Sequence, residues 1–453
     1  MSDIKMKIYE HSPIPIQHML ITLEGRRLKN QRYGKVYWNF LKELEQRDYT
    51  NEQEEIRYQE REMQRLIQHA VKKSSFYRDF YKGVDIDSIK TIADLKRLPI
   101  LSKEIVRQNL ETMYAIDEKS ALVSHTSGTS GKALKFLFEP DDVQKRMAHL
   151  DFFKKQHGVI NLTMKRASFS DRKIVPRNQT AKVYWRDNLL LKQRIYCTPY
   201  CQPQHAEAIV KNLNEYKPQS MDGMPSAIYE LAKWINENNY PVTFQPLAIF
   251  TTSETVYPHY RKEIEKAFGC KVRDQYASSE GAPFIAECKE GKFHYNLTTG
   301  IVEIAEDGEI FVTCFNTYGT PLIRYAIGDR VEVSERKTKC KCGSVHPIIE
   351  RIDGRTNDYL QSKTKGKFTS VHLSLVNEKF AGAIRKMQFR QSSLDKVLVL
   401  VEATENYTDK VSNVIKRDLN YLLGDETEVQ ISLVEHIPTG NNNKFRLIIN
   451  EIK

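Results

Sequence analysis

The chain has 453 residues, of which 40% are hydrophobic and 28% charged, so it can form a sizeable core and is too long for one ordinary domain. Its mean hydropathy of −0.55 and the lack of an apolar run of about 18 residues exclude a membrane span, and its opening residues lack the apolar segment of a secretory signal. We therefore expect a soluble, cytoplasmic protein whose net charge of +11 favours acidic partners, such as nucleic acids, anionic surfaces or phosphate-rich small molecules.

Helical and strand patterns follow one another along the first three quarters of the chain. Apolar residues recur every three or four positions within residues 50–83, which predicts a packing helix. Pro99 interrupts the next helical pattern, and Ser102 is a suitable N-cap for the helix that follows. From about residue 121, short strand-like runs alternate with helical stretches, an order typical of α/β layers. The strand-like runs are residues 246–252, 300–304 and 309–313, and the helical stretches are residues 226–237 and 257–268.

A second pattern begins after a polar stretch at residues 353–367. It predicts a helix, a strand, a helix and a strand, which is a small α+β unit of about ninety residues, a normal domain size. We therefore place the domain boundary near residues 353–358, with domains at 1–354 and 355–453. The four elements are expected at residues 373–380, 397–402, 407–423 and 428–433.

The most informative local pattern is a loop rich in glycine and hydroxyl residues. It reads Ser124-His125-Thr126-Ser127-Gly128-Thr129-Ser130-Gly131-Lys132. Small residues let the backbone approach an anion, hydroxyl and N–H groups donate to its oxygens, and a lysine balances its charge. The spacing of the glycines is too short for a Walker loop. A flexible turn with an incidental lysine is the plain alternative, but the density of these residue types favours a phosphate site.

Five further segments follow this loop in an order that resembles the adenylate-forming superfamily of acyl-CoA synthetases. They are Phe250-Thr251-Thr252-Ser253-Glu254, Tyr276-Ala277-Ser278-Ser279-Glu280-Gly281, Arg324-Tyr325-Ala326-Ile327-Gly328-Asp329, Gly354-Arg355-Thr356-Asn357-Asp358 and Pro438-Thr439-Gly440-Asn441-Asn442-Asn443-Lys444-Phe445-Arg446. Within the superfamily, the flanking sequence is most similar to the phenylacetate-CoA ligase group and its branch from capsular polysaccharide loci. The supporting segments are residues 74–83, 95–104, 217–232 and 388–401.

This resemblance implies an α/β fold with a large N-terminal adenylation body of several subdomains and mixed sheets, and a small α+β lid that rotates about a hinge. It also implies two half-reactions. A carboxylate attacks the α-phosphate of ATP to give acyl-AMP and pyrophosphate, and a nucleophile then displaces AMP. The expected partners are a small carboxylic acid and ATP, without nucleic acid and without a membrane, and a homodimer is left open. A role in capsular or extracellular polysaccharide biosynthesis is one option.

The resemblance further assigns roles to single residues, each of which has an ordinary structural explanation when taken alone. The expected catalytic residues are Lys444, which would stabilise charge in the transition state, Glu280, which would hold Mg²⁺, and Lys132. The expected nucleotide-binding residues are Ser127, Gly128, Thr129, Ser130, Gly131, Lys132, Ser253, Glu254, Tyr276, Ser279, Asp329 and Arg355. The expected acyl pocket consists of Gly223, Met224, Pro225 and Ala277.

Two departures from the family pattern concern the acceptor. Asn357 stands where the hinge often has aspartate, and residues 361–374 lack the loop sequence of typical phenylacetate-CoA ligases. Because that loop normally helps to form the thioester-forming state, two acceptors stay open: coenzyme A, or an amine such as an amino sugar that would give an amide. A basic, zinc-containing nucleic-acid binder is a third alternative, disfavoured because the basic residues are dispersed.

The seven cysteines are too sparse for a disulfide framework, but some could bind a metal. Cys288 pairs in the sequence with His294, and Cys340 with Cys342, which together make the Cys₃His set common in structural zinc sites. Similar pairs occur in relatives within the ligase group. The spacings differ from those of a standard finger, so free cysteines beside a surface histidine are the alternative. The remaining cysteines are read as packing residues: Cys197, Cys201, Cys270 and Cys314.

Overall fold

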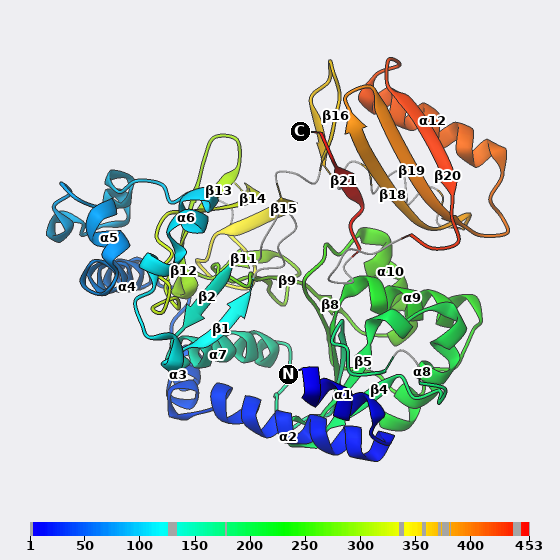
Figure 1. Cartoon of the computed structure of the whole chain (residues 1–453), viewed down its shortest axis with the longest axis horizontal. Helices are drawn as coiled ribbons and strands as arrows, with labels where there is room; N and C mark the ends of the chain where they lie inside the picture. Colours follow the sequence, from blue (N-terminus) through cyan, green and yellow to red (C-terminus); the bar gives the residue numbers. More distant parts are fainter. Residues whose placement is uncertain are drawn as a thin grey trace. The chain divides into compact units, whose positions relative to one another are not determined.

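The structure is a computed structural model that forms two compact units (Figure 1). Unit 1 comprises Met1–Val256, Arg261–Ile327 and Val331–Arg351, and unit 2 comprises Tyr257–Tyr260, Gly328–Arg330 and Ile352–Lys453. The described residues are 3–125, 134–176, 179–334, 339–355, 359–369, 373, 380, 382–437 and 445–452. None of the helices in these ranges is both long and apolar enough to cross a bilayer.

Three helices begin unit 1: α1 (Asp3–His11), α2 (Ile14–Arg32) and α3 (Lys35–Gln46). The first two are fastened by buried hydrogen bonds that bridge large sequence separations, α2 to the edge strand of a sheet and α1 to a loop. The fully buried Arg186 donates through Nε to Oε1 of Gln17 at 2.7 Å, 169 residues away. The hydroxyl of Tyr9 donates to the carbonyl of Ile174, 165 residues away.

The packing helix predicted at residues 50–83 is confirmed as α4 (Glu52–Lys73), with a buried apolar face. The side chain of Asn51 caps its start. Ser74 ends it and caps a separate helix, α5 (Ser75–Phe80). The next helix is α6 (Lys103–Met113), and the expected N-cap Ser102 is confirmed, because its hydroxyl accepts a hydrogen bond from the N–H of Ile105 at 3.2 Å. Short 3-10 helices lie at Ile86–Ser88, Ile92–Arg97, Glu118–Ser120, Leu189–Leu191, Thr198–Tyr200 and Leu297–Thr299.

A six-stranded sheet forms one part of unit 1, and its neighbouring strands are parallel except for the first pair. Its strands, in spatial order, are β4 (Trp185–Asn188), β5 (Gln193–Cys197), β3 (Arg166–Ser170), β6 (Ser220–Gly223), β7 (Ile249–Thr251) and β8 (Val272–Arg273). Parallel neighbours need crossover connections, which here include helices. These are α8 (Pro203–Tyr216), α9 (Pro225–Glu237) and α10 (Pro258–Phe268). The strand and helices predicted between residues 226 and 268 are thereby confirmed.

A seven-stranded sheet forms the other part, and it contains both strands predicted at residues 300–313. Its strands, in spatial order, are β12 (Gly300–Ile304), β13 (Glu309–Cys314), β14 (Tyr325–Val333), β15 (Ile348–Arg355), β11 (Phe293–Tyr295), β10 (Ile285–Glu287) and β9 (Gln275–Tyr276). A separate antiparallel pair, β1 (Leu122–His125) and β2 (Lys135–Phe138), flanks residues 126–133, which lie outside the described part.

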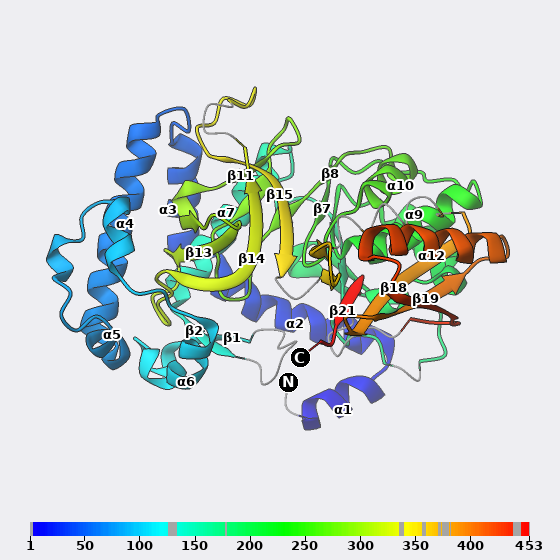
Figure 2. The same ribbon diagram turned by 90° about the horizontal axis from the view of Figure 1, so that it is seen from above.

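Unit 2 contains a four-stranded sheet in the order β20-β19-β18-β21. These strands are β20 (Glu428–Leu433), β19 (Lys396–Ala403), β18 (Ile384–Ser393) and β21 (Ile448–Asn450), and a hairpin pairs β16 (Tyr359–Gln361) with β17 (Lys367–Thr369). Helix α12 (Asp409–Leu423) lies alongside β18 and β19 (Figure 2). The last three predicted elements are confirmed, whereas the predicted helix at 373–380 lies outside the described residues apart from its two ends.

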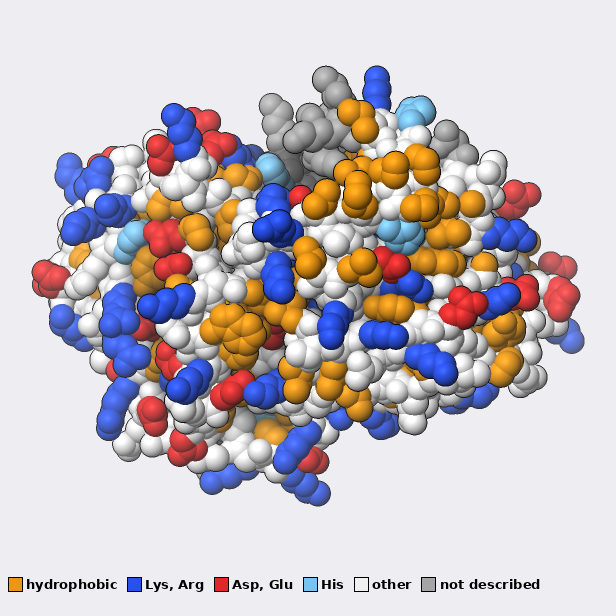
Figure 3. All heavy atoms as spheres, turned by 90° about the horizontal axis from the view of Figure 1, so that it is seen from below, with side chains coloured by type: hydrophobic (Ala, Val, Ile, Leu, Met, Phe, Trp, Pro, Cys, Tyr) orange, Lys and Arg blue, Asp and Glu red, His pale blue; other side chains and the backbone are white. Residues whose placement is uncertain are grey.

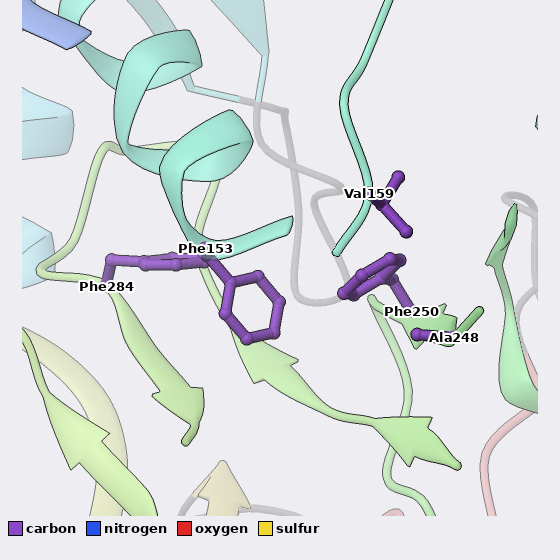
Figure 4. Packing of buried hydrophobic residues seen from close by; sticks show 5 residues of the cluster. All are labelled: Phe153, Val159, Ala248, Phe250 and Phe284. Atoms are coloured by element: carbon purple, nitrogen blue, oxygen red, sulfur yellow. The ribbon is translucent and has the colours of Figure 1, made fainter. Parts of the chain in front are cut away.

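Helix α7 (Pro140–Gln156) is held between the two large sheets by an aromatic cluster (Figure 4). The ring of Phe153 meets the ring of Phe250 on β7 at 5.3 Å, edge to face, and the ring of Phe284 just before β10 at 5.6 Å in the same geometry. Val159 and Ala248 complete the cluster. Edge-to-face pairs add to the free energy of burial, so Phe153 fixes the helix to both sheets at once.

We expect Phe153→Ala to lower the free energy of unfolding of unit 1 by about 3–5 kcal/mol, because the cavity it leaves has aromatic walls that cannot collapse freely. All three tryptophans of the chain, Trp38, Trp185 and Trp234, lie in unit 1, so tryptophan fluorescence during urea denaturation reports on that unit. The control Leu247→Ala, at a side chain that is 52% exposed, should change stability by less than about 0.5 kcal/mol. Equal effects of the two substitutions would contradict the role given to Phe153.

Candidate active site and metal centre

A cavity of about 500 Å³ opens within unit 1, a volume ordinary for a small-molecule site. Its lining comes from helices α2 and α7, from strand β1 and from segments around β7, β9 and β10. The lining residues are Arg27, Leu28, Gln31, Arg32, Leu122, Val123, Ser124, Phe138, Val143, Arg146, Met147, His149, Leu150, Thr252, Gln275, Ala277, Gly281, Ala282, Phe284, Thr299 and Asn316.

Three of the six motifs identified in the sequence contribute to this cavity. Ser124 opens the glycine-rich loop, Thr252 belongs to the second motif, and Ala277 and Gly281 belong to the third. A hydrogen bond also joins the second motif to the residue two positions before the third: the Thr251 hydroxyl donates to Asp274 at 2.7 Å. The structure therefore brings together segments that are more than a hundred residues apart in the chain.

The residues expected in the acyl pocket divide into two groups. Ala277 lines the cavity, whereas Gly223, Met224 and Pro225 are not among its lining residues. Gly223 has φ of +139°, and a Cβ atom there would lie 2.1 Å from the carbonyl oxygen of Phe169. Only glycine fits such a close backbone approach. The glycine, the buried Met224 and the helix-starting Pro225 together form the turn from β6 into α9.

The second motif also contributes to the start of α9. Glu254 accepts a hydrogen bond through Oε2 from the N–H of Ser226 at 3.1 Å, which places a carboxylate at the positive end of the helix dipole. Ser253 precedes it with φ of +74°. The chain therefore turns sharply between β7 and this contact, and Thr252 at the same turn reaches the cavity.

The third motif contains a buried carboxylate and contacts the guanidinium of Arg146. Tyr276 is half-buried on β9, Ser279 is exposed, and Glu280 is only 6% exposed. Arg146 on α7 donates through Nη2 to the carbonyl of Ser278 at 3.0 Å. Burial lowers the pKa of the Arg146 guanidinium, and the nearby Cys314, Asp142 and Glu280 oppose this shift.

Arg146 is a site residue that the sequence analysis missed. Its guanidinium lies over the ring of Phe138 at 4.7 Å. The same group is 3.7 Å from the position that a Cβ atom on Gly281 would take. One arginine within a mixed helix gives no signal in a sequence with 69 basic residues. Its importance follows from the packing of α7 against the third motif.

The remaining expected site residues lie elsewhere or outside the described part. Asp329 is half-buried within β14, and Arg355 is the last residue of β15, with its side chain outside the described part. Arg324, at the start of the fourth motif, forms a bidentate ion pair with Glu303, with N–O distances of 2.8 and 2.9 Å. The residues outside the description are Ser127, Gly128, Thr129, Ser130, Gly131, Lys132 and Lys444.

The two predicted Cys and His pairs converge on one point of unit 1. Cys288 Sγ lies 3.7 Å from Cys340 Sγ, Cys342 Sγ lies 3.5 Å from Nε2 of His294, and all four ligand atoms lie within 4.8 Å of one another. A tetrahedral zinc ion with Zn–S bonds of about 2.3 Å requires neighbouring sulfur atoms about 3.8 Å apart. The donor set and its spacing therefore fit zinc.

The orientation of the histidine ring also suits a metal ligand. Nδ1 of His294 lies 2.8 Å from the carbonyl oxygen of His346, an arrangement in which Nδ1–H donates and Nε2 keeps its lone pair. The pairing of β11 with β15, which sets His294 opposite Ile348, brings this ring to the cysteines that precede β15. The remaining cysteines, Cys197, Cys201, Cys270 and Cys314, are not part of this cluster.

Comparison with known proteins gives one full-length relative and a shared fold. Residues 360–451 match the family model described as the CapK C-terminal domain. The chain is 36% identical over 454 residues to Protein CapK of Staphylococcus aureus, covering 98% of this chain and 99% of that protein.

Two solved structures of 2-hydroxyisobutyryl-CoA ligase share the fold. The postadenylation state in complex with R3-HIB-AMP has a TM-score of 0.68 at 17% identity and covers 86% of this chain and 88% of that chain. The thioesterification state with 2-HIB-AMP and CoA has a TM-score of 0.58 at 17% identity and covers 89% and 91%. The predicted fold class, an α/β body of several sheets with a C-terminal α+β part, is confirmed.

Proposed function

The chain belongs to the CapK family, and we propose that it is an AMP-forming acid ligase that activates a carboxylic acid with ATP. The observation that carries this proposal is the convergence of three superfamily motifs on one cavity. The shared fold adds support, since the ligase with the same architecture is described in complex with acyl-AMP. A carboxylate oxygen would form a bond to the α-phosphorus while the bond to the bridging oxygen breaks and pyrophosphate leaves.

Each motif would serve one requirement of this displacement. Residues 127–132 would hold the β- and γ-phosphates, with Lys132 as the counter-charge. Glu280 would hold Mg²⁺, which suits one carboxylate plus phosphate oxygens, and its burial keeps competing water away. Lys444 would stabilise the charge that develops between the two reactants. Tyr276, Ser253, Glu254, Ser279, Asp329 and Arg355 would position the nucleotide.

Two acceptors could receive the acyl group: coenzyme A or an amine. The neighbouring ligase is described with CoA in its thioesterification state, which favours coenzyme A as the acceptor. Asn357 and residues 361–374 depart from the family pattern in the region that would serve that state, which keeps an amine acceptor in view. We propose coenzyme A as the acceptor, in capsular or extracellular polysaccharide biosynthesis.

The face drawn in Figure 3 favours a small-molecule role over nucleic-acid binding. On the face drawn in Figure 3, lysine and arginine side chains are scattered, with acidic and apolar side chains between them. A nucleic-acid interface would need basic side chains clustered along one face. The positive charge is better suited to attracting ATP.

We expect a screen of carboxylic acids to find acid-dependent release of pyrophosphate from ATP. Lys444→Ala should slow this release by at least about 100-fold and leave ATP binding, measured by calorimetry, nearly unchanged, because the lysine acts on transition-state charge. Lys410→Ala, at an exposed lysine of α12, is the matched control and should keep the wild-type rate. A wild-type rate in Lys444→Ala would refute the role of that lysine, and no release with any acid would refute adenylation.

The acceptor is tested separately with the acid that the screen identifies. Incubation with coenzyme A and, in parallel, with amines that include amino sugars should yield a thioester as the main product, detected by mass spectrometry. An amide as the main product would replace coenzyme A with an amine acceptor.

We further propose that Cys288, His294, Cys340 and Cys342 hold a structural zinc ion. All four ligands come from the protein, so no open position remains for a substrate and a catalytic role is not implied. The ion would join the β10–β11 hairpin to the segment between β14 and β15.

We expect one zinc ion per purified chain by elemental analysis. Cys342→Ser should lose the ion and melt at a lower temperature, because it removes one of the four ligands. Cys270→Ser, at a half-buried cysteine outside the cluster, should keep both properties. Cobalt substitution of the wild-type chain gives a second readout that needs no variant, since three thiolates produce intense charge-transfer absorption. Stoichiometric zinc in Cys342→Ser, or no such absorption, would refute the site.

A further inference from the structure

We propose that the acid activated by this chain carries a second anionic group in addition to the carboxylate that reacts, and that Arg32 binds this second group. The inference rests on the proposed function, since it names the class of substrate that the same cavity takes. It also names a specificity-determining residue outside the six motifs.

The charges that line the cavity have one sign. Among the described residues that line it, three are arginines, Arg27, Arg32 and Arg146, and none is an aspartate or glutamate. Arg27 is exposed and already paired with Glu24. The other two form no ion pair with any carboxylate in the described part of the chain. A monocarboxylic acid could satisfy only one of them.

Arg146 is placed to meet the carboxylate that reacts. It donates a hydrogen bond to the carbonyl of Ser278 in the third motif, which also contains Glu280, the residue that we assign to Mg²⁺. A guanidinium has five N–H donors in a fork that matches a carboxylate, and only one hydrogen bond is described for Arg146. Asp142 neutralises the charge of Arg146 only weakly, because burial raises the pKa of the Asp142 carboxyl to about 7.

Arg32 lies in a different electrostatic environment, at the last turn of α2. Its charged neighbours include Arg172 and Arg166, and burial followed by the Arg172 charge lowers the pKa of its guanidinium. Such an environment costs free energy that a bound anion would recover. Helix α2 lies outside all six motifs, so the resemblance assigns this position no role in nucleotide binding.

Asp151, whose charge acts on Arg32, and Asp222, whose charge acts on the neighbouring Arg166, are already bound by other groups. Asp151 accepts hydrogen bonds from Tyr37 at 2.8 Å and Asn161 at 2.9 Å. Asp222 is bound by Lys154 at 2.7 Å. Although its burial acts in the opposite direction, Lys154 and Arg166 lower the pKa of Asp222 to about 2. The positive charge of Arg32 is therefore left for a ligand.

The remaining lining residues indicate which carbon skeleton the ligand has. Ten of the lining residues are apolar, and Phe138, Met147 and Phe284 are the bulkiest of them. Apolar lining residues together with two cationic ones fit an aliphatic or aromatic skeleton that carries two anionic groups. A dicarboxylic acid is the simplest member of this class.

The test compares dicarboxylates from succinate to suberate, and terephthalate, with the monocarboxylate that replaces one carboxylate of each by a methyl group. Pyrophosphate release and ligand-induced changes in melting temperature are measured in parallel. Wild type should prefer the dicarboxylate of a matched pair. Arg32→Gln should raise KM for the dicarboxylate by about 10- to 100-fold, the loss expected for a charged hydrogen bond, and leave KM for the monocarboxylate unchanged. Arg26→Gln, at an exposed arginine of the same helix, should change neither.

The two readouts separate failure of this inference from failure of the proposed function. Equal KM values within each pair, or equal losses for both acids in Arg32→Gln, would overturn the second anion site and leave adenylation standing. A raised KM for ATP in Arg32→Gln would assign the residue to the nucleotide and overturn the inference. Dicarboxylates that raise the melting temperature of wild type but not of Arg32→Gln, without pyrophosphate release, would overturn adenylation and support the anion site. No binding and no release with any acid would overturn both.

Discussion

The position of helix α7 is the constraint on which the site depends. Phe153 locks the helix between β7 and the segment before β10, and Arg146 lies seven residues earlier, two turns away on the same face. At the N-terminal end, Asp142 accepts a hydrogen bond from the N–H of Tyr318 at 2.8 Å, which fixes the helix against the segment after β13. Because the helix is held at both ends, the guanidinium of Arg146 has little freedom, and the cavity wall that it forms is rigid.

Local patterns in the sequence predicted those elements of the fold that depend on residues close to one another in the chain. The periodicity within residues 50–83 indicated α4, and the hydroxyl of Ser102 indicated the start of α6. The cysteine and histidine pairs indicated a cluster because each pair is close in sequence. The strand β18 was missed, since its alternating polar residues resemble a loop until β19 and β21 pair with it on either side.

The parts of the site that the sequence could not indicate are those created by long-range packing. Gly223 was expected in the acyl pocket, but its requirement comes from the carbonyl of Phe169, a neighbour on the adjacent strand. In the sequence, Arg146 and Arg32 look like ordinary helical arginines. Only the fold shows that both line one cavity and that neither forms an ion pair with a carboxylate in the described part of the chain. Burial and charge pairing are properties of the folded chain, and residue type alone does not predict them.

The hydrogen bonds that fasten α1 and α2 also constrain how the chain folds. Gln17 and Tyr9 find their partners at Arg186 and Ile174, more than 160 residues later, so closing these contacts is entropically costly and late. During synthesis, which proceeds from the N-terminus, the hydrogen bond between Gln17 and Arg186 cannot form until the ribosome has delivered β4, although α2 can already pack against α7. The wall of the cavity that carries Arg32 therefore depends for its fastening on a strand that is made much later than the helix itself.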